Sequence, residues 1–73
     1  MPPDRLVRMA NQIAIFFATQ DRAAAPAEVA EHLRQFWDPR MRRAIIAHAA
    51  AGGAGLDPVA AAAISQLAAD QAQ

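Results

Sequence analysis

The sequence predicts a small all-α domain, and three observations support that prediction. Alanine, which has the highest helix propensity, accounts for much of the 55% hydrophobic fraction. The β-branched residues nowhere alternate with polar ones over several positions, as they would in a half-buried strand. Two Asp-Pro steps, at 38–39 and 57–58, place aspartate at an N-cap and proline at the first helical position. With 73 residues, the chain is expected to form one domain spanning 1–73.

Four helices are expected, joined by short turns that contain proline or glycine. Asp4 is expected to cap the first helix, and Pro26 to open the second. Gly52 and Gly53 are expected to end the third, because glycine adopts the left-handed conformation of a helix C-terminus. The expected ranges are about 4–19, 26–36, 39–51 and 58–69, followed by a frayed tail at 70–73.

The first helix carries an unusually wide apolar face. Its apolar arc covers roughly 200°, against the roughly 100° stripe of an ordinary surface helix. Two interpretations follow: a central helix buried by its three neighbours, or a helix that packs inward on one face and against a partner on the other. Met9, Ile15 and Phe16 are the candidates for such an interface. The isolated chain is accordingly expected to form a homo-oligomer through this surface.

The second helix is expected to bury a stripe that ends in a pair of aromatic residues. Val29, Leu33 and Phe36 form the stripe, and Trp37 stands at its exit. Phe36 is therefore expected to be partly buried, with Trp37 above it on the surface.

The first turn of the third helix contains Arg40, Arg42 and Arg43. Cations are unfavourable there, because a helix N-terminus already carries partial positive charge. The arginines could form an anion site, face an acidic protein, or simply be solvated with their stems on apolar surface. Charge and chemistry favour an acidic protein first, a phosphorylated cofactor second and nucleic acid last, because the formal net charge is zero. The candidate binding residues are Phe36, Trp37, Arg40, Arg42 and Arg43.

Residues for catalysis or metal binding are scarce. The chain has no cysteine, which excludes thiolate ligands. Glu28 and His32 share a helix face, but His48 is the only other histidine and a zinc site needs three or four ligands. Ser65 has no neighbouring base in the sequence to activate it. No catalytic or metal residue is therefore expected, and no apolar stretch reaches the roughly 20 residues that span a bilayer.

Three blocks carry a resemblance to a known family. They read RLVRMANQIAIFF (5–17), HLRQFWDPRMRRAI (32–45) and GLDPVAAAAISQL (55–67). Together they resemble the delta subunit of the soluble, NAD-dependent, molybdenum-containing formate dehydrogenases. That resemblance implies a cytoplasmic, non-catalytic accessory subunit. The implied role is to bind the catalytic (large) subunit and to support either insertion of its molybdenum cofactor or stability of the complex.

The resemblance also implies how the chain meets the cofactor. The large subunit carries molybdenum on a bis-guanine-dinucleotide pterin, and the complex oxidises formate and reduces NAD. The delta subunit is expected to bind no cofactor through its own ligands, while it could contact the guanine-dinucleotide cofactor held by the large subunit. Two alternatives stay open at this point: a stand-alone anion- or nucleotide-binding module, and a small helical nucleic-acid binder whose affinity would fall steeply with salt.

Overall fold

A computed structural model of the chain describes residues 2–71. Within that range the chain is helical, with no strand, so the all-α prediction is confirmed. The helices are α1 (Pro3–Gln20), α2 (Ala25–Phe36), α3 (Pro39–Ala50) and α4 (Pro58–Gln71). Each begins and ends within two residues of its expected position.

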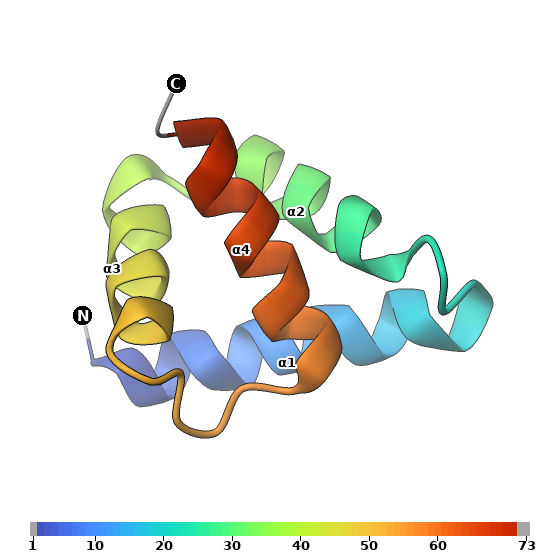
Figure 1. Cartoon of the computed structure of the whole chain (residues 1–73), viewed down its shortest axis with the longest axis horizontal. Helices are drawn as coiled ribbons and strands as arrows, with labels where there is room; N and C mark the ends of the chain where they lie inside the picture. Colours follow the sequence, from blue (N-terminus) through green and yellow to red (C-terminus); the bar gives the residue numbers. More distant parts are fainter. Residues whose placement is uncertain (1, 72–73) are drawn as a thin grey trace.

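The helices pack around α1 and α4. Figure 1 shows α4 running through the middle of the molecule, α3 and α2 on either side of it, and α1 lying across the base of the view. α2 and α3 each pack against both α1 and α4 rather than mainly against each other, and the contact between α2 and α4 is the most extensive. The core therefore lies where all four helices meet.

Aliphatic side chains of moderate size, together with Trp37, fill this core. Alanines separate them and let the helices approach closely, and no polar or charged side chain is buried among residues 2–71. Each buried leucine or isoleucine contributes about 1.5–3 kcal/mol relative to an exposed one. The largest fully buried side chains are Leu6, Val29, Leu33, Ile45, Ile64 and Leu67.

The wide apolar arc of α1 is only partly covered. Its buried residues are Leu6, Ala10 and Ala14, whereas Ile15 and Phe16 are 56% and 57% exposed. The three neighbouring helices thus bury one face of α1 and leave part of the arc in solvent. This arrangement agrees with the interpretation in which α1 packs inward on one face and exposes apolar surface on another.

Two of the expected helix caps are confirmed and one is wrong. The Asp38 carboxylate accepts a hydrogen bond from the Met41 N–H at 2.9 Å, and the Asp57 carboxylate accepts one from the Val59 N–H at 2.8 Å. Asp4 is not the cap of α1, because the helix begins one residue earlier, at Pro3, and its capping position has no side-chain hydrogen bond. Asp4 lies in the first turn, where its charge still favours the helix.

α3 ends as its two glycines predict. The Gly53 N–H donates to the His48 carbonyl at 2.9 Å, and the Gly52 N–H donates to the Ala49 carbonyl at 3.2 Å. These are the paired bonds of a Schellman motif, which requires left-handed backbone. Both glycines have positive φ, 122° at Gly52 and 64° at Gly53.

α4 extends further than the sequence suggested. Asp70 and Gln71, which were expected to fray, belong to the last turn of the helix. The Asp70 carboxylate pairs with the guanidinium of Arg34 on α2, which ties the two helix ends together. The remainder of the expected tail, 72–73, lies outside the described residues.

Candidate functional site

The corner between α2 and α3 reverses the expected positions of its two aromatic residues. Phe36 is the last residue of α2 and is 70% exposed, while Trp37 is only 4% exposed and belongs to the core. The expected burial of Phe36 and surface position of Trp37 are therefore both wrong. The reason is local: Trp37 leaves the helix in an extended conformation (φ −91°, ψ 136°), so its side chain no longer follows the helical period.

Arg42 stabilises this corner. Its Nη1 donates to the backbone carbonyl of Trp37, and also to that of Arg34 at 3.3 Å. The Arg42 Nε is buried and makes no hydrogen bond within the described chain. Nη1 of Arg42 is thus engaged by the chain itself, and the expectation that Arg42 belongs to an outward contact surface stays a prediction.

Arg40 and Arg43 remain available to a partner. Both are exposed, and neither forms an ion pair or side-chain hydrogen bond with any of residues 2–71. With Asp38 they line one open hollow, and Arg40 shares a second with Arg5 at the start of α1. We call Arg5, Arg40 and Arg43 the arginine end. Its electrostatics favour anionic groups, with Asp38 as the one carboxylate that lines both hollows.

Aromatic rings from α1 and α2 form a second surface. The Phe16 and Phe17 ring centroids are 5.3 Å apart, those of Phe17 and His32 6.1 Å, and those of His32 and Phe36 4.8 Å. Phe16 and Phe36 are exposed at the two ends of this row, and Phe17 and His32 are half-buried between them. We call these four residues the aromatic ridge. The sequence pattern placed Phe36 in the core and therefore did not reveal it.

The three interface candidates on α1 lie in different surroundings. Phe16 belongs to the aromatic ridge, whereas Met9 is half-buried and packs against the core. Ile15 lines a separate hollow with Arg22 and Val59, on the side of α1 that faces the start of α4. The proposal that these three residues form one interface stays a prediction.

An ion-pair cluster joins α2 to the end of α4. Arg34 donates to Glu31 at 2.9 Å and pairs with Asp70, and the Gln35 side chain donates to Glu31 at 2.8 Å. The hydrogen bonds from Arg34 and then Gln35 lower the pKa of Glu31, and the hydrogen bond to Glu31 raises the pKa of Arg34. Because the side chains are exposed, the cluster contributes little to stability and is sensitive to salt.

The two histidines and Glu28 do not come together as ligands. His32 is part of the aromatic ridge, and His48 makes a 2.8 Å hydrogen bond from Nε2 to the Ala54 carbonyl. Over residues 2–71 no three or more histidine, aspartate or glutamate side chains are grouped as a metal site requires. His48 instead fixes the glycine-rich turn after α3.

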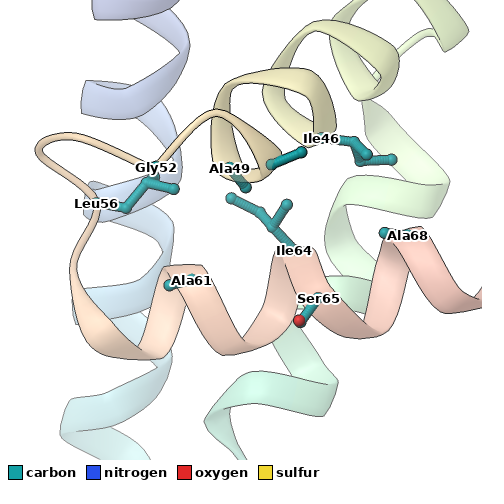
Figure 2. A pocket seen from close by; sticks show the side chains of 10 residues that line it. Ile46, Ala49, Gly52, Leu56, Ala61, Ile64, Ser65 and Ala68 are labelled. Carbon is teal, nitrogen blue, oxygen red and sulfur yellow. The ribbon is translucent and has the colours of Figure 1, made fainter.

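The groove between α3 and α4 is apolar. Figure 2 shows Ile64 of α4 pointing toward Ala49 of α3. Ile46, Ala61 and Ser65 also line the groove. Leu56 closes the end of the groove near the interhelical turn. No histidine, aspartate or glutamate lines it, so Ser65 has no base beside it that could make it a nucleophile.

One contact was not foreseen from the sequence. Asn11 accepts a hydrogen bond from the Asp57 N–H and donates one to the Gly55 carbonyl. Asn11 lies among the polar residues of α1, and nothing in its position distinguishes it from solvent-facing neighbours such as Gln12. Only the packing of the later turn against α1 shows its role.

The chain matches the model of a known protein family. The family model described as NADH-dependent formate dehydrogenase delta subunit matches residues 5–64. No curated protein and no solved structure matches the chain. None of the helices within residues 2–71 is both long enough and apolar enough to cross a membrane.

Proposed function

Because the chain belongs to the delta-subunit family of NADH-dependent formate dehydrogenase, we propose that it is a non-catalytic accessory subunit of that complex. In this proposal it binds the catalytic subunit and supports insertion of the molybdenum cofactor or stability of the assembled enzyme. The isolated chain is then expected to have no formate-dependent NAD reductase activity of its own.

The observation that carries the proposal is the difference among the arginines. Arg34 and Arg42 are engaged by carboxylates and carbonyls of the chain itself, whereas Arg40 and Arg43 contact no such group within residues 2–71. Each cation in the first turn of a helix costs about 0.3–1 kcal/mol at low salt. Arg40 lies in the first turn of α3 and Arg43 directly after it, and binding an anionic surface of the catalytic subunit would offset the cost of placing these cations there.

The chemistry of the arginine end limits what it can contact. Guanidinium groups bind carboxylates and phosphates through paired hydrogen bonds. Acidic side chains of the catalytic subunit are our first choice of partner, and the pyrophosphate groups of its guanine-dinucleotide cofactor are the second. In that second case the guanidinium groups of the arginine end would bind the phosphates of the cofactor.

Co-expression with the catalytic subunit tests this proposal. The informative variant combines Arg40→Ala with Arg43→Ala and leaves Arg42 in place, because Arg42 holds the corner of the fold. The matched control combines Arg8→Ala with Arg22→Ala, which removes the same charge from other exposed positions. We expect the first variant to bind the catalytic subunit about tenfold more weakly and the control to bind as the wild type does.

Two outcomes would count against the proposal, and each would contradict a different part of it. If the wild-type chain fails to retain the catalytic subunit, the accessory role itself is wrong. If the wild type binds and the Arg40/Arg43 variant binds equally well, with unchanged molybdenum per catalytic subunit, the arginine end is not the contact surface.

A further inference from the structure

The two end residues of the aromatic ridge, Phe16 and Phe36, lie outside the core of this domain. Phe16 and Phe36 are 57% and 70% exposed, while the buried core closes behind them with aliphatic residues and Trp37. Exposed large aromatic side chains are costly to leave in water, and they are enriched at the centres of protein interfaces. The ridge therefore has the composition of a docking surface.

The border of the ridge is acidic. Glu28, Glu31 and Gln35 line a shallow hollow whose floor and walls include Phe17, His32 and Phe36. Nearby charges are the carboxylates of Glu28, Glu31 and Asp70 and the guanidinium of Arg34, a formal sum of −2. Glu28 has no ion-pair or side-chain hydrogen-bond partner in the described part of the chain. The charge around the ridge is thus negative, opposite to the positive charge of the arginine end.

This charge pattern disfavours a second copy of the chain as the occupant. A two-fold dimer places the same patch on both subunits, so pairing the ridge with itself brings Glu28 and Glu31 close to their own copies. Pairing the ridge with the arginine end of another copy is heterologous, and such contacts tend to extend into open assemblies. A different protein with complementary charge avoids both problems.

We infer that the aromatic ridge binds a segment of another formate dehydrogenase subunit that carries an apolar anchor side chain next to arginine or lysine. The anchor would occupy the hollow between Phe17 and Phe36, and the neighbouring cation would face Glu28. This inference rests on the proposed function, and it adds a second surface to the arginine end. The chain would then contact its complex through two surfaces of opposite charge.

The test is co-purification with the other formate dehydrogenase subunits, using variants at exposed positions that leave the core intact. Phe16→Ser and Phe36→Ser should each weaken retention of the complex about tenfold, as truncation of a buried aromatic anchor does. Ile15→Ser is the matched control, because Ile15 is equally exposed on the same helix but lies outside the ridge. It should leave retention unchanged.

Charge variants at Glu28 test whether the partner places an arginine or lysine opposite this carboxylate. Glu28→Lys should weaken retention more than Glu28→Gln, and the Glu28→Gln complex should depend less on salt than the wild type. Light scattering measures the oligomeric state of the isolated chain. It compares the wild type with Phe36→Ser to test whether the ridge is a contact between copies.

The outcomes separate the inference from the proposed function. If the wild type retains no subunit, the proposed function fails and the inference fails with it. If the wild type binds but the ridge variants and the Ile15 control bind equally well, only the inference is overturned. It is also overturned if the isolated chain is a dimer that Phe36→Ser dissociates, because the ridge is then a contact between copies.

Discussion

Asn11 and Gly55 are joined by a 2.9 Å hydrogen bond, from the side-chain Nδ2 to the backbone carbonyl, across 44 residues of sequence. The Oδ1 of the same amide accepts the Asp57 N–H at 2.8 Å. One side chain on α1 therefore satisfies two backbone groups of the turn that leads into α4. This turn also places Asp57, the cap of α4.

Asn11→Ala is expected to lower the free energy of unfolding by about 1–3 kcal/mol, because it leaves the partly buried Asp57 N–H without a partner. For a domain of this size, each kilocalorie corresponds to a decrease in Tm of about 4–8 °C. Urea and thermal unfolding followed by circular dichroism measure the change. Gln12→Ala, at the next and exposed position, is the control and should stay within about 0.5 kcal/mol of the wild type. Equal effects of the two substitutions would contradict the bridging role of Asn11.

Substitutions of two α3 arginines should change the stability of the domain in opposite directions. Arg42→Ala should destabilise the domain by about 1.5–3 kcal/mol, since it removes a charged donor from the carbonyls of Arg34 and Trp37. Arg43→Glu should instead stabilise it by about 0.3–1 kcal/mol at low salt, because it replaces a cation near the N-terminus of α3 with an anion. Urea denaturation at low and high salt measures both effects. The interpretation fails if Arg43→Glu is as destabilising as Arg42→Ala.

Gly53 should tolerate substitution poorly. Its φ of 64° is left-handed, and an added Cβ would lie 3.3 Å from the Leu56 Cδ1. Gly53→Ala is expected to cost about 1–2 kcal/mol from the backbone conformation. Gly53→Asn carries the same Cβ but should cost less, because asparagine accepts this conformation more readily. Urea midpoints of the two variants distinguish backbone strain from crowding: if Asn costs as much as Ala or more, crowding against Leu56 dominates.

The cluster around Arg34 should make stability depend on pH in acid. The hydrogen bonds from Arg34 and Gln35 lower the pKa of Glu31 below its ordinary value of 4.5. A carboxyl with a lower pKa in the folded state stabilises the fold above its unfolded pKa and loses that effect as the pH falls through the folded pKa. Glu31→Gln should therefore flatten the decrease in the urea midpoint below about pH 4.5. Glu28→Gln is the control, and the same flattening in both variants would contradict a specific role for Glu31.

Local signals in the sequence were sufficient to predict where the helices begin and end. The Asp38-Pro39 and Asp57-Pro58 steps and the Gly52-Gly53 pair act within one helical turn, so their geometry is determined by a few neighbouring residues. The family match likewise agrees with the resemblance seen in three short blocks.

The surface was harder to predict, for physical reasons that specific residues illustrate. The side chain of Trp37 turns inward because the chain leaves the helix at that residue, which an extrapolated helical period does not include. That turn exposes Phe36 and so creates one end of the aromatic ridge. Arg42 resembles its neighbours in sequence and differs only in reaching the carbonyl of Trp37. Asn11 and Asp70 have partners far away along the chain, so only tertiary packing defines their roles.

The most direct test of the account is the affinity of the isolated chain for a purified catalytic subunit of formate dehydrogenase that was produced without it. Calorimetry measures this binding, with the Arg40/Arg43 double variant as the comparison. The account predicts saturable one-to-one binding that the double variant weakens about tenfold. Absence of binding to the catalytic subunit, under conditions where the chain keeps its helical structure, would contradict the account.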